Sequence, residues 1–132
     1  MLLACACSSD LDVHNDYLFD LEVMPVPKRI IENQTVEIRC RIVKEGDYRD
    51  ARYFIRMFIT DGKGELRLDD GRNLSPNDLY PLPNETFRMY YTSRSTDQQS
   101  IDVYIVNSAG KTILKTFSFQ NESIKKDEGG DE

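Results

Sequence analysis

Tryptophan is absent from this chain of 132 residues, histidine occurs once and cysteine three times. A structural zinc site normally requires four ligands from cysteine, histidine or carboxylate side chains. Cys5 and Cys7 are separated by a single residue, and no second pair follows them. We therefore expect no metal centre, and a disulfide framework is not expected either, because only Cys40 lies within the body of the chain.

Long apolar runs are also missing, and no stretch reaches the roughly 20 apolar residues that span a bilayer. The net charge is −6 and the pI is about 4.8. Affinity for nucleic acid depends mainly on neutralising phosphates, so an acidic chain is not expected to bind it. The length suits one domain with its own core.

The chain lacks the apolar stripe of an amphipathic helix, and apolar and polar residues alternate instead. The clearest alternating run is Val36–Ile42, in which Cys40 lies on the apolar side as a small buried hydrophobe. Runs of this kind predict seven strands, near residues 17–23, 36–42, 53–59, 66–68, 87–91, 101–105 and 113–119. This pattern predicts an all-β fold, an immunoglobulin-like antiparallel β-sandwich of about seven strands, with a small barrel as the alternative.

The first ten residues, MLLACACSSD, resemble the processing site of a bacterial lipoprotein. Leu2–Ala4 matches the apolar segment that precedes the lipidated cysteine, which predicts lipidation at Cys5. Cys7 is the rival, because the polar start of a mature lipoprotein follows it. A complete secretory signal has a longer apolar region, so the segment is expected to be a signal remnant. An accidental cysteine-rich N-terminus is the alternative.

Three segments are therefore expected. Residues 1–16 are a signal remnant and flexible tether, residues 17–119 form the sandwich, and residues 120–132 are a disordered charged tail. The single histidine, His14, lies in the tether and has no nucleophile to activate. No catalytic residue and no cofactor are predicted.

Residues 74–83 contain Pro76, Pro81 and Pro83, which exclude a regular central strand. The segment also carries apolar residues, among them Tyr80. It either packs back on the sandwich or is held for a partner, so Tyr80 is a candidate contact residue.

A second candidate surface follows from a conflict within one predicted strand. If Tyr53 and its alternating neighbours face the core, Phe54, Arg56 and Phe58 face outward. An outer strand face is normally polar, yet two of these three residues are aromatic. Tyr104 joins them if the third and sixth strands pair as in an immunoglobulin domain. These four residues are candidate partner-binding residues, unless the proline-rich loop or the tail covers them.

The segments PNDLYPLP, FRMYYTSRS and QQSIDVYIVNSAG, together with FDLEVMPVPKRI, TVEIRCRI and YFIRMFITDGKGELRLDDG, resemble the TraQ family of Bacteroides-type conjugative transposons. The resemblance covers roughly residues 17–119. It implies a non-enzymatic accessory lipoprotein of the transfer apparatus, anchored by lipid in the bacterial cell envelope, with protein components of the conjugation machinery as partners. It brings no catalytic residues and leaves the oligomeric state open. An adhesin-like or carbohydrate-binding domain is the alternative function.

Overall fold

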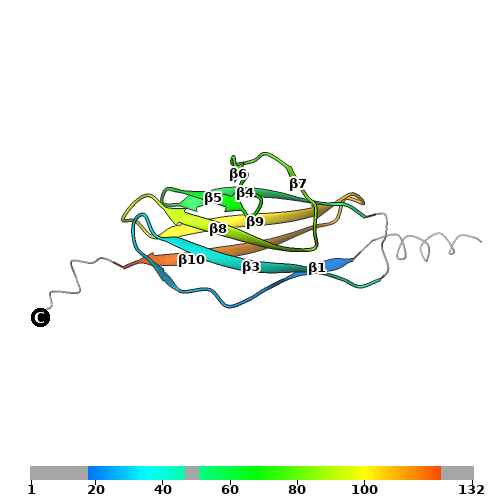
Figure 1. The fold of residues 1–132 in the computed structure, drawn as a ribbon, viewed down its shortest axis with the longest axis horizontal. Coiled ribbons are helices and arrows are strands. Elements are labelled where there is room, and N and C mark those ends of the chain that lie inside the picture. The colour runs from blue at the N-terminus through cyan, green and yellow to red at the C-terminus, as the bar shows by residue number, and fades with distance from the viewer. Residues whose placement is uncertain (1–17, 47–50, 123–132) are drawn as a thin grey trace, which may run out of the picture.

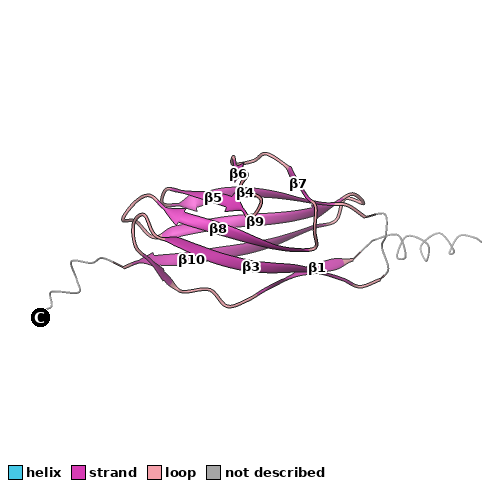
Figure 2. Ribbon diagram, viewed as in Figure 1, coloured by secondary structure: helices cyan, strands magenta, loops and turns pink. Residues whose placement is uncertain are grey.

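The computed structural model describes residues 18–46 and 51–122, which form strands and loops only (Figures 1 and 2). Within these ranges no helix is long and apolar enough to cross a membrane. The strands are β1 (Phe19–Val23), β2 (Arg29–Ile30), β3 (Thr35–Lys44), β4 (Tyr53–Asp61), β5 (Gly64–Leu68), β6 (Asn73–Leu74), β7 (Tyr80–Leu82), β8 (Thr86–Ser93), β9 (Gln99–Asn107) and β10 (Thr112–Asn121).

The strands form two sheets of five, in the orders β1-β3-β8-β5-β6 and β2-β10-β9-β4-β7. When the three shortest strands, β2, β6 and β7, are set aside, seven remain in the orders first-second-fifth-fourth and seventh-sixth-third. This is the strand order of an immunoglobulin constant-type sandwich. The predicted fold class is confirmed, and so is the pairing of the third and sixth strands, which are β4 and β9.

The three short strands extend the edges of the sheets, and the sequence did not predict them. β7 contains Pro81 and pairs with the first residues of β4. It is an edge strand, the position in a sheet that tolerates proline because one side of the strand needs no N–H donor. At the other end of the chain, β10 continues to Asn121, two residues beyond the expected end of the sandwich.

The core lies between the sheets and is built from the apolar side of each alternating strand. Along β3 the burial alternates without a break, and Cys40 is 3% exposed with a free thiol. The predicted burial of Cys40 is confirmed. The buried apolar residues of the two sheets are Phe19, Leu21, Ile30, Val36, Ile38, Cys40, Ile42, Tyr53, Ile55, Met57, Leu66, Leu68, Leu74, Leu82, Phe87, Met89, Tyr91, Ile101, Val103, Ile105, Phe117 and Phe119.

One polar contact is built into this core. The ring of Tyr91 stacks on Phe119 with centroids 6.0 Å apart, and its hydroxyl donates a hydrogen bond of 2.6 Å to Gln99 Oε1. Gly64 lies against the Tyr91 hydroxyl and the Thr92 carbonyl, where a Cβ atom has no room. The close approach of β5 to β8 therefore requires glycine at this position.

Candidate protein-binding face

The pairing of β4 with β9 brings the predicted contact residues together on the outer surface of their sheet. Arg56 lies directly opposite Tyr104, and Phe58 lies opposite Asp102. The rings of Phe58 and Tyr104 meet edge to face, with centroids 5.7 Å apart and planes at 88°. Phe54 completes the row along β4. The four residues predicted on this surface are thus neighbours in the folded chain.

The next strand extends this surface beyond what the sequence predicted. Leu114 of β10 lies opposite Tyr104 and is 47% exposed, and Val106 of β9 lies opposite Phe54. We name the set Phe54, Arg56, Phe58, Tyr104, Val106 and Leu114 the aromatic face. The sequence carried a signal for Leu114, because it is an apolar residue on the polar side of an alternating run.

Arg56 lies near the middle of the aromatic face and has no polar partner among the described residues. Its Nε atom is buried and makes no hydrogen bond to any described residue, and no ion pair to Arg56 occurs within residues 18–46 and 51–122. An unmet donor on a charged group costs free energy in the isolated domain. A ligand that supplies an acceptor among the surrounding rings would remove that cost.

The outer surface of the opposite sheet has a different character. Glu37 lies between Arg88 and Arg39, at 3.3 and 4.0 Å, and Arg41 pairs with Glu22 at 2.6 Å. These charges satisfy one another and remain solvated, as exposed pairs do. The two faces of the sandwich therefore differ. One, which we name the charge-paired face, carries the ion pairs of Glu37 and Glu22, and the other carries rings around Arg56, with Asp102 beside Phe58.

Tyr80 does not belong to the aromatic face. It lies opposite Ile55 in the β4–β7 pair, on the side of the sheet that faces the core, and packs against that core. Its hydroxyl accepts a hydrogen bond of 2.9 Å from the Ser75 N–H. The proline-rich loop is held beside the sheet by β7 and by a hydrogen bond from the Asn77 N–H to the Met57 carbonyl. It lies at the edge of β4 as an added strand.

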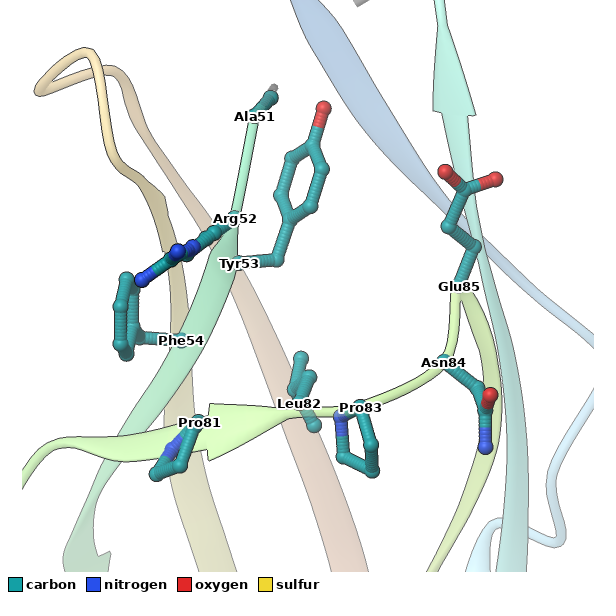
Figure 3. Close-up of a pocket in the computed structure, with 9 residues that line it drawn as sticks. All are labelled: Ala51, Arg52, Tyr53, Phe54, Pro81, Leu82, Pro83, Asn84 and Glu85. Atoms are coloured by element: carbon teal, nitrogen blue, oxygen red, sulfur yellow. The ribbon is translucent and has the colours of Figure 1, made fainter. Parts of the chain in front are cut away.

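A pocket of about 380 Å³ opens at one end of the sandwich, between the start of β4, strand β7 and the chain that leads into β8 (Figure 3). Phe54 and Pro81 line one side, and Glu85 lines the side that belongs to the other sheet. A sugar site of the type considered from the sequence needs paired exposed aromatics beside carboxylates. Here the ring of Tyr53 is buried, and Glu85 forms an ion pair of 2.9 Å with Lys44. The pocket does not provide that arrangement.

Other chemistry has little support in the described part of the chain. No group of three or more histidine, cysteine, aspartate or glutamate side chains could hold a metal ion there. Burial raises the pKa of the Cys40 thiol to about 12, so the thiol stays protonated and a poor nucleophile near neutral pH. The two predicted lipidation candidates, Cys5 and Cys7, lie outside the described residues.

These features define the class of molecule as an immunoglobulin-like β-sandwich with one charge-paired face and one aromatic face. The chain belongs to the TraQ conjugal transfer protein family, whose model matches residues 1–122. The resemblance found in the sequence is thereby confirmed.

Three solved structures from Bacteroides are similar to the chain. A lipoprotein from Bacteroides thetaiotaomicron is 53% identical, with a TM-score of 0.74 over 86% of this chain and 87% of that one. A conjugative transposon lipoprotein from Bacteroides eggerthii is 42% identical, with a TM-score of 0.76 over 80% and 100%. A conjugate transposon protein from Bacteroides vulgatus is 40% identical, with a TM-score of 0.72 over 83% and 89%. A comparison with curated proteins found no match.

Proposed function

We propose that the protein is a non-enzymatic accessory lipoprotein of a conjugative transfer apparatus that binds another protein of that apparatus through the aromatic face. Membership of the TraQ family supports the setting in conjugation. Relatives described as lipoproteins support a lipid anchor in the cell envelope, with Cys5 as the lipidated residue and Cys7 as the rival.

The aromatic face is the observation that carries the binding role. Aromatic residues and arginine are enriched where proteins bind one another, and such residues dominate binding energy at the centres of interfaces. Phe58, Tyr104 and Arg56 are neighbours on this face. The buried Nε–H of Arg56 finds no acceptor among the described residues. An acidic group of the partner would meet that donor on binding.

The test is conjugal transfer from cells that carry Phe54→Ala or Arg56→Ala in the intact element. Both variants should transfer less often while melting close to the wild type, because both side chains lie on the outer surface. Arg39→Ala on the charge-paired face is the matched control and should transfer normally. Wild-type transfer by both face variants would overturn the proposal.

Nucleic acid is not the expected ligand of this face, although stacked aromatics also bind single strands. The purified protein should not shift single-stranded DNA at physiological salt, because the chain carries a net charge of −6. A salt-sensitive gel shift that is lost in Phe54→Ala would replace the protein-partner proposal with DNA binding.

A further inference from the structure

Strand β10 forms an outer edge of its sheet over most of its length. The described chain provides a neighbour on that side only at Gln120 and Asn121, which pair with the two residues of β2. From Thr112 to Ser118 the strand is paired with β9 alone. An edge of this kind presents unpaired backbone groups that another strand can use.

Two hydrogen bonds fix which backbone groups face this edge. The Gln120 N–H donates to the Lys28 carbonyl on the side away from β9, whereas the Lys111 carbonyl accepts from the Asn107 N–H on the side of β9. Backbone groups alternate between the two sides of an antiparallel strand, and the register from Thr112 to Phe119 is unbroken. The residues whose N–H and C=O groups face the edge are therefore Thr112, Leu114, Thr116 and Ser118.

The neighbouring edge in the other sheet has one of its backbone donors already bonded by a side chain. In β1 the Leu21 N–H, which points away from β3, is bonded by the Asp20 carboxylate at 2.7 Å. No described residue accepts a hydrogen bond from the N–H of Leu114 or Thr116 on the open side. Charged side chains, lysine above all, protect an edge strand against indiscriminate pairing. Lys115 is such a residue on β10, so a strand that pairs with this edge has to accommodate its charge.

The side chains along the open edge select the kind of strand that fits. Leu114 lies on the outer side, next to Tyr104, so an added strand would place an apolar side chain opposite it, whereas the flanking outer residues Thr112 and Thr116 are polar. Lys115 points to the other side and is 37% exposed, and its contact with Asp20 is a long one of 3.8 Å. Arg29 is exposed at the end of the same edge. Cross-strand pairs favour opposite charges, so an acidic side chain fits the position opposite Lys115. Ile113 and Phe117 flank Lys115 on the same side of β10 and favour apolar side chains opposite them.

The same charges disfavour pairing with a second copy of this chain. Two copies of β10 would bring Lys111 and Lys115 from both onto one seam, and like charges on neighbouring strands repel.

We propose that the open edge of β10 accepts an extended segment of a partner protein that is mainly apolar and carries an acidic residue opposite Lys115. The segment would add a strand beside β10, with backbone hydrogen bonds to Leu114 and Thr116 and apolar side chains continuing the aromatic face. This proposal rests on the proposed function, because it specifies how the partner reaches that face.

Purified protein provides the first test, with a synthetic peptide of valine and threonine that carries one central glutamate and a matched peptide with lysine in its place. The glutamate peptide should bind at least about tenfold more tightly than the lysine peptide. It should also slow hydrogen exchange at the amides of Leu114 and Thr116, measured by NMR. Absence of binding, or equal binding of both peptides, would overturn the proposal.

A proline substitution tests the open edge without removing a hydrogen bond between β10 and β9. Thr116→Pro removes an N–H that faces the open edge and does not bond to β9, so the sheet should remain intact. Thr116→Ala is the control, since it also loses the hydroxyl that donates to Asp102 but keeps the N–H. Peptide binding should be at least about tenfold weaker in Thr116→Pro than in Thr116→Ala. If Thr116→Pro does not fold, Leu114→Pro and Leu114→Ala make the same comparison.

Conjugal transfer then distinguishes this proposal from the broader one. Thr116→Pro should transfer less often than Thr116→Ala. Reduced transfer by Phe54→Ala with equal transfer by the two Thr116 variants would overturn strand addition and leave the protein-binding role in place. Wild-type transfer by all of these variants would overturn both.

Discussion

Phe58 and Tyr104 meet edge to face across two neighbouring strands, with ring centroids 5.7 Å apart. They are diagonal neighbours, because Tyr104 lies opposite Arg56 and Phe58 lies opposite Asp102. Both rings lie on the outer surface of the sheet, where a polar pair would be the ordinary choice.

This pair should stabilise the domain only modestly. A double-mutant cycle of Phe58→Ala and Tyr104→Ala should give a coupling energy of about 0.5–1.5 kcal/mol in urea unfolding, as aromatic pairs do. Each single variant should nevertheless reduce transfer, because the rings form part of the proposed binding face. A coupling near zero would show that the pair does not form in solution.

Removal of the buried thiol should destabilise the core. Cys40→Ala leaves a small cavity in an apolar site and should lower the free energy of unfolding by about 1–2 kcal/mol. Cys40→Asp should be far more destabilising, because it places a charge there without a partner. Urea unfolding measures both, and rapid labelling of native Cys40 by a thiol reagent would contradict its burial.

The same thiol should make stability depend on alkaline pH. Burial raises the pKa of Cys40 to about 12, whereas an unfolded thiol ionises near about 8.5. Above about pH 8.5 the unfolded chain releases a proton that the folded chain keeps, so the free energy of unfolding falls as pH rises toward 12. Cys40→Ala lacks this contribution, and its stability deficit relative to the wild type should shrink by about 1.4 kcal/mol per pH unit above pH 9. A constant deficit from about pH 7 to 10 would contradict the shift.

The hydroxyl of Tyr91 should matter more than that of its neighbour in the sequence. Tyr91→Phe leaves the buried Gln99 Oε1 without the 2.6 Å hydrogen bond and should cost about 1–3 kcal/mol. Tyr90→Phe is the control, because its hydroxyl makes an exposed contact of 3.4 Å with Glu37. Its effect on urea unfolding should stay within about 0.5 kcal/mol.

The N-terminal prediction concerns residues outside the described structure. In the native host the mature protein should carry lipid on Cys5, because Leu2–Ala4 fits the segment before a lipidated cysteine. Mass spectrometry of the mature N-terminus decides between Cys5 and Cys7. Lipid on Cys7, or an unmodified N-terminus, would show that the choice of Cys5 is wrong.

The period of two in the sequence determined which side chains face the core. It placed Cys40 inward and Phe54, Arg56 and Phe58 together on one surface, because successive residues of a strand point to opposite sides. The same pattern, with the turn residues, was enough to predict seven strands and an immunoglobulin-like sandwich, all of which the structure contains.

Only the tertiary structure decided the register of each strand pair and the neighbours of the short strands. The register of β4, β9 and β10 placed Tyr104 between Leu114 on one side and Arg56 on the other. The pairing of β7 with β4 turned Tyr80 toward the core instead of the aromatic face. Both outcomes depend on contacts between residues far apart in the chain. Local alternation fixes which face each side chain occupies, but it does not say which residue of a distant strand lies opposite. The open edge of β10 has the same origin, since it exists only because β2 pairs with no more than the last two residues of that strand.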